Sequence, residues 1–144
     1  MGAAVLFTDE AGRVMIAEPV YKDYWEIIGG AVDENESPKQ AAAREVEEEL
    51  GKTLLPGRLL VVDWVPPRPG RAEGLMFVYD GGTLTERDTT DIHLPPDELR
   101  SWAWCTEEQI KERMSALLAR RVTAAMRAKA DGAVYELENG FRTS

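Results

Sequence analysis

The sequence predicts an α/β or α+β fold. Short apolar, β-branched runs come first, one segment with a helical pattern interrupts them, and further strands and helices follow. Strands and helices that alternate in this way are typical of a layered domain in which helices cover a sheet. A chain of 144 residues is long enough for one such domain with its own hydrophobic core. We therefore expect residues 1–144 to form a single domain.

The first half of the chain contains three predicted strands. Ala3–Phe7 and Arg13–Glu18 are apolar runs separated by the turn residues TDEAG, which predicts a hairpin. Asp23–Ile28 is aromatic and β-branched and predicts a third strand, with Gly29–Gly30 as its end. These strands supply the first part of the expected sheet.

The segment after these strands predicts a helix with defined ends. Ser37 is a good N-cap residue, Pro38 occupies the first helical position, and Gln40 stands where a capping box requires Glu or Gln. Strong helix formers continue to residue 50, and Gly51 is well placed to end the helix. This is the element that the sequence defines best.

The second half predicts more strands and a long helix. The expected elements are strands at Arg58–Val65, Leu75–Asp80 and Leu99–Cys105, a helix at Met114–Ala130 and a last strand within residues 133–139. Gly81–Gly82 predicts a turn, and residues 83–99 are polar and predicted to be irregular. Thr106 is a predicted helix cap, and the final residues are expected to fray.

Composition narrows the classes of function. The chain has 26 acidic and 17 basic residues, a net charge of −9, which argues against binding extended nucleic acid. A small phosphate ligand remains compatible, because a bound divalent cation reverses the local field. Cys105 is the only cysteine, so no disulfide can form within the chain, which fits a reducing compartment. No run approaches the ~20 apolar residues of a membrane span. The first residues do not resemble a signal peptide. We expect a cytoplasmic protein without a membrane partner.

The predicted helix carries a dense group of acidic residues. At helical spacing, three of them share one face: Glu45, Glu48 and Glu49. An apolar stripe beside that face predicts the contact with the core: Ala42, Val46 and Leu50. Glu47 points away from both and is expected to be exposed. Three convergent carboxylates suit a hard cation such as Mg²⁺, whereas the alternative is an ordinary solvated acidic face.

The spacing of residues around these acids resembles a known signature. The pattern G-x5-E-x7-R-E-U-x-E-E-x-G, where U is a bulky aliphatic residue, is followed by Gly30, Glu36, Arg44, Glu45, Val46, Glu48, Glu49 and Gly51. It resembles the Nudix box of the Nudix hydrolases, and it implies their α/β/α sandwich around a mixed β-sheet. The box runs to Lys52, which replaces the usual aliphatic residue, with Leu54 as a substitute for packing. Ile28 stands where the family often has proline.

The resemblance implies roles for individual residues. Glu45, Glu48 and Glu49 are expected to bind Mg²⁺ or Mn²⁺, together with the carbonyl of Gly29. Glu36 and Arg44 are expected to pair and brace the loop before the helix, so that they, Gly30 and Gly51 support the box structurally. The expected reaction is the attack of water on a phosphorus of a diphosphate, usually in a nucleoside diphosphate linked to another group.

The general base and the substrate stay open at this stage. Glu45 or Glu48 is a candidate base, and so is Glu98, because many family members use an acid a few residues before a Trp-containing strand. Glu98 is otherwise a solvated loop acid, and Asp88, Asp91 and Asp97 are weaker alternatives. Four residues are expected to contact substrate: Tyr24, Trp64, Arg68 and Arg71. For the two aromatic residues the alternative is packing in the core, and for the two arginines it is an ordinary position on the surface.

Other functions remain as alternatives. A Nudix-like chain can hydrolyse a non-nucleotide diphosphate, such as an isoprenoid or specialised metabolite, or bind a ligand without catalysis. Without the resemblance, the chain would be an acidic interaction domain. We expect a small-molecule diphosphate as the partner. The resemblance also admits a homodimer, because helices of this family line dimer interfaces.

Overall fold

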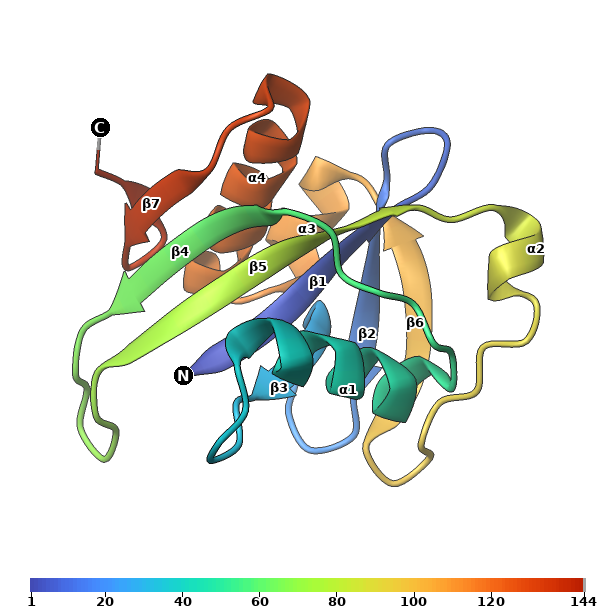
Figure 1. The fold of residues 1–144 in the computed structure, drawn as a ribbon, viewed down its shortest axis with the longest axis horizontal. Helices are drawn as coiled ribbons and strands as arrows, with labels where there is room; N and C mark the ends of the chain where they lie inside the picture. The colour runs from blue at the N-terminus through green and yellow to red at the C-terminus, as the bar shows by residue number, and fades with distance from the viewer. Residues whose placement is uncertain (144) are drawn as a thin grey trace.

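The computed structural model of the protein describes residues 1–143, so that Ser144, the last residue of the predicted domain, lies outside the described residues. A mixed eight-stranded sheet runs through it in the order β6-β2-β1-β5-β4-β7-β8, with β3 paired to β1 (Figure 1). The strands are β1 (Gly2–Thr8), β2 (Val14–Pro19), β3 (Ile28–Ala31), β4 (Leu59–Val65), β5 (Gly74–Thr83), β6 (Leu99–Cys105), β7 (Tyr135–Glu138) and β8 (Phe141–Arg142).

Strand β1 is central to this sheet. It pairs antiparallel with β2 and with β3, and parallel with β5. The pairing of Thr8 with Val14 closes the predicted hairpin between β1 and β2. Strand β4 lies antiparallel to β5 and parallel to β7, so the sheet is mixed, as predicted.

Helices cover both faces of the sheet (Figure 1). Helix α1 (Pro38–Leu50) covers one face, and α3 (Glu107–Arg113) and α4 (Ala116–Asp131) cover the other, whereas α2 (Glu86–Thr89) is one turn in the connection from β5 to β6. A separate hydrophobic core lies under each layer, with Leu50 and Phe7 in one and Val122 and Leu6 in the other. The predicted α/β/α sandwich is confirmed.

Helix α1 begins and ends as the sequence predicts. The Ser37 hydroxyl accepts a hydrogen bond from the Gln40 N–H at 3.1 Å, and the Gln40 side chain accepts one from the Ser37 N–H at 2.9 Å. Gly51 ends the helix in the left-handed region, with φ of 69°. The predicted stripe is fully buried: Ala42, Val46 and Leu50. Glu47 is exposed, so the helix is oriented as expected.

Two glycine pairs lie inside strands rather than at their ends. The predicted strand at Asp23–Ile28 is wrong, because β3 begins at Ile28 and contains Gly29 and Gly30, which pair with Ala4 and Ala3. A Cβ on Gly29 would lie 2.4 Å from the Ala3 carbonyl oxygen. The predicted turn at Gly81–Gly82 is likewise part of β5. In both places glycine permits close packing inside the sheet.

The C-terminal part differs from the prediction at its ends. The long helix begins after Ser115, because Met114 still ends α3. The final residues were expected to fray, but Phe141–Arg142 form β8 and pair with β7. Asn139 and Gly140, with φ of 54° and 81°, form the tight turn between them. Within residues 1–143, no helix combines the length and the apolar character that crossing a membrane requires.

Candidate active site

Helix α1 and strand β3 place two of the predicted acids against the glycine pair. Glu49 is 6% exposed, and its Oε1 accepts a hydrogen bond from the Gly29 N–H at 2.9 Å. The Glu45 carboxylate lies so close to Gly30 that a Cβ there would be 2.4 Å from Oε1. Glycine at position 30 therefore leaves the space that the Glu45 carboxylate occupies.

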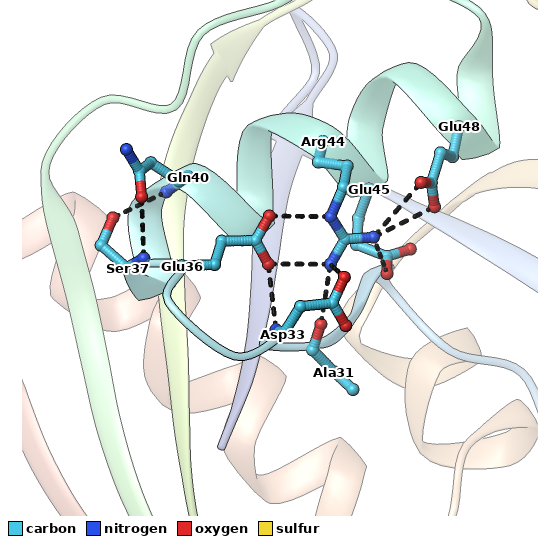
Figure 2. Close-up of polar contacts among 8 residues, drawn as sticks. All are labelled: Ala31, Asp33, Glu36, Ser37, Gln40, Arg44, Glu45 and Glu48. Carbon is cyan, nitrogen blue, oxygen red and sulfur yellow. Dashed lines mark hydrogen bonds and ion pairs between the residues drawn. The ribbon is translucent and has the colours of Figure 1, made fainter.

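Arg44 binds the loop that precedes the helix (Figure 2). Its Nε donates to Glu36 Oε2 at 2.8 Å and its Nη2 donates to Glu36 Oε1 at 3.0 Å, a two-point contact. Nη2 also donates to the Ala31 carbonyl at 3.0 Å, and the Asp33 N–H donates to Glu36 Oε1 at 3.0 Å. The predicted contact between Glu36 and Arg44 is present, and it fastens the end of β3 to the middle of α1.

The remaining nitrogen of Arg44 points toward the predicted metal ligands (Figure 2). Nη1 donates to Glu45 Oε1 at 3.0 Å and lies 3.2 Å from Glu48 Oε2. The Glu48 side chain is 53% exposed, whereas that of Glu45 is 15% exposed. Arg44 therefore divides its charge among four carboxylates, those of Asp33, Glu36, Glu45 and Glu48, and Asp33 and Glu48 are the two whose side chains are mostly exposed.

The ion pairs of Arg44 fix its own charge state and that of Glu36. Hydrogen bonds from Arg44, followed by the one from the Asp33 backbone, lower the pKa of Glu36 to about 2. The hydrogen bond to Glu36 is the largest cause of a raised pKa for Arg44, and Glu48 and Glu45 add to it. Both groups are therefore ionised at neutral pH, which is what a bracing contact requires.

Glu45 and Glu49 are in the opposite electrostatic situation. Burial raises the pKa of Glu49, the nearby charge of Glu45 raises it further, and the Gly29 N–H offsets only part of the rise. Burial also raises the pKa of Glu45, against the effect of Arg44. A buried carboxylate beside a partly buried one needs a proton or a cation between them at neutral pH. Their oxygens are the ligands that Mg²⁺ and Mn²⁺ prefer, so these residues fit a divalent cation.

The third predicted ligand does not join this pair. Within residues 1–143, no group of three Asp, Glu, His or Cys side chains is arranged to hold a metal ion. The reason is visible in Figure 2, where the Glu48 carboxylate is turned toward Arg44. The sequence predicted that the three carboxylates converge, and the structure brings only Glu45 and Glu49 together.

Three residues beside this pair were not predicted as part of the site. The Tyr21 hydroxyl donates to Glu26 Oε1 at 3.1 Å, and Lys22 Nζ lies 3.0 Å from Glu26 Oε2. The charge of Glu26 contributes to the raised pKa of Glu49, so Glu26 extends the acidic cluster. The signal in the sequence was the position of Glu26 three residues before Gly29, which the expected strand at 23–28 obscured.

Glu98, the predicted acid outside the box, lies near the same cluster. Its side chain is exposed, and its carbonyl accepts a hydrogen bond from the Val20 N–H at 3.0 Å. Burial and Glu26 raise the pKa of Tyr21 to about 12, and the charges of Glu49 and Glu98 add to the rise. Two weaker alternatives have other partners, since Asp88 caps α2 and Asp91 pairs with Lys52.

The aromatic residues expected to contact substrate differ in position. Trp64 is 37% exposed and follows Asp63, whose side chain bonds to Arg121 of α4. Since successive strand residues point to opposite faces, Trp64 lies on the face that α1 covers. Tyr24 is 42% exposed and lies under Lys22. Trp25 packs against the core on the α4 side.

The two arginines expected to reach phosphate groups lie on the loop between β4 and β5. Arg68 and Arg71 are joined by two backbone hydrogen bonds, of 2.9 and 2.8 Å, across a tight turn. Within residues 1–143, neither side chain forms a hydrogen bond or an ion pair with another residue. The structure therefore leaves both side chains exposed and does not join them to the acidic cluster.

Solved structures share this fold. The "MutT protein" from Methanosarcina mazei Go1 superposes with a TM-score of 0.72 at 23% identity, over 91% of this chain and 93% of that one. A "UDP-X diphosphatase" gives a TM-score of 0.74 at 16% identity, over 95% of this chain and 66% of that one. A NUDIX hydrolase from Nitrosomonas europaea gives 0.71 at 19% identity, over 93% and 90%. At these identities the likeness concerns the fold.

Curated relatives match in sequence over a shorter stretch. The RNA pyrophosphohydrolase of Hydrogenovibrio crunogenus is 33% identical over 63 residues, which are 42% of this chain and 38% of that protein. The 8-oxo-dGTP diphosphatase of Proteus vulgaris is 40% identical over 53 residues, 34% of this chain and 47% of that protein. The chain thus matches less than half the length of these relatives. The model of the NUDIX domain matches residues 1–126. The chain therefore belongs to the Nudix hydrolase family.

Proposed function

We propose that this protein hydrolyses a diphosphate linkage in a nucleoside diphosphate derivative, in a reaction that depends on Mg²⁺ or Mn²⁺. The observation that best supports the proposal is the pair Glu45 and Glu49, which lie side by side against Gly29 and Gly30 with raised pKa values, Glu49 buried and Glu45 partly buried. The matched relatives act on RNA and on 8-oxo-dGTP, both of which are nucleotide compounds.

The residues proposed to hold the cation are Glu45, Glu48 and Glu49, together with the Gly29 carbonyl. A divalent cation bound there neutralises phosphate charge and lowers the pKa of a water molecule. The chain itself contributes fixed positions. The Gly29 N–H holds Glu49, and Arg44 holds Glu45 from one side while Gly30 leaves room for it on the other. These contacts orient carboxylate oxygens before any ligand arrives.

The proton from the attacking water requires a carboxylate as its acceptor. Glu45 is a candidate because burial raises its pKa toward the working pH, which favours a general base. Glu48 is a candidate because its carboxylate is exposed to solvent beside Glu45. Glu98 is the third, because it lies near Tyr21 and the acidic cluster. Replacing each by glutamine and comparing the pH dependence of kcat at saturating Mg²⁺ separates the three, since with the metal site filled only loss of the base removes the acidic limb of the profile.

A hydrolysis screen tests the proposed reaction. The wild-type protein is incubated with nucleoside diphosphate derivatives and with isoprenoid diphosphates, each in the presence of Mg²⁺, Mn²⁺ or EDTA. We expect turnover of a nucleotide compound that EDTA abolishes. The Glu48→Gln variant should lose this turnover and the Glu47→Gln variant should keep it. Turnover of isoprenoid diphosphates alone contradicts the nucleotide class, and no metal-dependent turnover of any diphosphate contradicts the reaction.

The proposed contacts to substrate are weaker and have their own test. Tyr24 and Trp64 are exposed aromatic residues that can stack on a base, and Arg68 and Arg71 are exposed cations that can reach phosphate groups. Alanine at a residue that only binds substrate raises KM and leaves kcat unchanged. A cytoplasmic location and a homodimer stay predictions.

A further inference from the structure

A cavity lies on the opposite side of the sheet from the acidic cluster. It has a volume of about 470 Å³ and lies between α4, the end of α3 and the hairpin of β7 and β8. Four of its lining residues are basic: Lys111, Arg120, Arg127 and Arg142. Within residues 1–143, no acidic residue lines it. In a chain of net charge −9, this concentration of positive charge predicts an anionic ligand.

Most of these cations have no carboxylate partner. Within residues 1–143, Lys111, Arg120 and Arg142 form no ion pair, and Arg127 lies 3.5 Å from Glu107 with both side chains largely exposed. An exposed pair of this kind contributes little and leaves Arg127 available to a ligand. The cavity therefore offers several N–H donors to one anion, which is how arginine and lysine bind phosphate.

A buried threonine lies in the wall of the same cavity. Thr123 of α4 is 7% exposed, and in the described part of the chain its Oγ1 has no hydrogen-bond partner. Buried polar side chains are nearly always paired, so an unpaired one calls for an explanation. The Oγ1 atom itself is shielded from solvent, so Thr123 adds no hydrogen-bonding group to the cavity surface.

The hairpin that closes the cavity is held rigidly. Arg120 donates to the Asn139 carbonyl at 2.8 Å, and Asp63 Oδ1 accepts the Gly140 N–H at 3.0 Å. Gly140 has φ of 81°, and a Cβ there would lie 3.0 Å from the Arg120 Cβ. Only glycine permits this turn to lie so close to α4. The turn therefore fixes the positions of Phe141 and Arg142, which follow it.

One wall of the cavity is aromatic. Phe141 is 58% exposed, and the Arg120 guanidinium lies 4.1 Å from its ring centroid. Small side chains of α4, such as Ala119 and Ala124, form an apolar surface nearby. An exposed phenylalanine and a flat guanidinium are surfaces on which a planar ring stacks. The cavity thus combines a surface for a ring with several donors for a negative group.

We propose that this cavity binds a small phosphorylated molecule with an aromatic ring, of the nucleoside monophosphate class, at a site separate from the carboxylates of α1. The phosphate lies among Lys111, Arg127 and Arg142, and the ring lies against Phe141. Helices α1 and α4 cover opposite faces of the sheet, so a ligand here does not occupy the diphosphate site (Figure 1).

Calorimetric titration of the metal-free protein with AMP in EDTA tests this proposal. Without metal, the carboxylates of α1 repel phosphate, so binding reports the cavity. We expect saturable binding of AMP, and binding at least about tenfold weaker for adenosine and for inorganic phosphate, each of which lacks half of the contacts. No saturable binding of AMP overturns the proposal. If adenosine binds as tightly as AMP, the proposed phosphate contacts are wrong. If inorganic phosphate binds as tightly as AMP, the proposed contact of the ring is wrong.

Variants and nuclear magnetic resonance locate the binding. The double variant Lys111→Ala, Arg127→Ala should weaken AMP binding about tenfold or more, because charge-assisted hydrogen bonds are lost. The double variant Arg87→Ala, Arg100→Ala removes the same charge elsewhere and should leave binding unchanged.

A measurement on the wild-type protein guards against misfolded variants. AMP should shift the amide resonances of α4 and of residues 140–142 and leave those of α1 in place. Shifts confined to α1, or equal loss of affinity in the two double variants, contradict the proposed site. Because this experiment uses no metal and no turnover, its failure leaves the proposed hydrolysis unaffected, and the reverse also holds.

Discussion

Helix α1 contains Glu49 and, through Arg44, binds Glu36 in the preceding loop. The electrostatic environments of these two glutamates are opposite. Glu36 receives two hydrogen bonds from Arg44 and one from the Asp33 backbone, which lower its pKa to about 2. Glu49 is buried, receives one N–H from Gly29 and lies beside Glu45, which raises its pKa. The difference teaches that the acidic segment has two parts. The first part, Glu36, is neutralised by Arg44 of the same chain. The second part, Glu45 and Glu49, still requires positive charge from a ligand or a proton.

Removing a carboxylate from the second part should have the largest effect. We expect Glu45→Gln to lower kcat/KM for the diphosphate substrate by about 10²–10³-fold, the range for losing one electrostatic contact to a transition state. Glu47→Gln on the exposed side of α1 is the matched control and should keep full activity. Steady-state kinetics with saturating Mg²⁺ measure both. Full activity of the Glu45→Gln variant would show that the two parts do not differ in the way proposed.

Displacing the same carboxylate without removing it should have the next largest effect. A Cβ at position 30 would collide with the Glu45 carboxylate, so Gly30→Ala must move that side chain. We expect kcat to fall by about 10²-fold, since a displacement near 1 Å is enough for such a loss. Gly74→Ala adds the same methyl group where no atom lies within 4 Å and should be neutral. Equal kinetics for the two variants would contradict the close contact.

The pH dependence of stability should distinguish the two parts in the absence of metal. The folded-state pKa of Glu49 is raised, so the native protein binds more protons than the unfolded chain, and its stability falls as pH rises. We expect the free energy of unfolding in EDTA to decrease from pH 5 to pH 8 by at least about 1.4 kcal/mol, the equivalent of one pKa unit. Urea titrations measure this decrease.

Two variants control that measurement. Glu49→Gln removes the titrating group and should flatten the dependence on pH, whereas Glu47→Gln changes the net charge equally and should not. Mg²⁺ should stabilise the wild-type protein more at pH 8 than at pH 6, because protons compete with the cation for the same oxygens. If the free energy of unfolding depends on pH with the same slope in the wild type, Glu49→Gln and Glu47→Gln, the effect comes from the overall charge and not from Glu49.

The smallest expected effect is the loss, in acid, of the stability that Glu36 contributes. The pKa of Glu36 is lowered from 4.5 to about 2, so its contribution to stability is present above pH 4.5 and is lost as pH falls toward 2. We expect Glu36→Gln to melt a few degrees lower than the wild type at pH 7, and the difference to shrink at pH 3. Thermal melting followed by circular dichroism measures it. A difference that stays constant between these pH values would contradict the ion pair with Arg44.

The parts of the structure that sequence predicted well depend on local signals. Helix α1 was predictable because Ser37, Pro38 and Gly51 are residues whose own chemistry starts or stops a helix. The pair Glu36 and Arg44 followed from the spacing of the Nudix box. In both cases the deciding interactions lie within a short segment, where spacing along the chain determines which groups meet.

The parts that sequence missed depend on contacts between distant segments. Gly29–Gly30 and Gly81–Gly82 have the composition of turns, and only the pairing of β1 with its neighbours shows why glycine is needed inside those strands. The charge of Glu26 acts on Glu49 because the chain just before β3, which bridges to Ala17, lies near α1, and no local pattern indicates this. The turn of Asn139 and Gly140 is the exception, because Asn-Gly is a recognised hairpin signal and could have been predicted.

Strand β8 also protects an edge of the sheet. It is the last strand in the order, it is two residues long, and its neighbour β7 carries the exposed Glu136 and Glu138. A long free edge presents unpaired N–H and C=O groups that recruit strands from other molecules, whereas a short, charged edge does not. The C-terminal hairpin therefore makes aggregation through this edge unfavourable, and truncating the chain after Asn139 should make the protein more prone to edge-to-edge association.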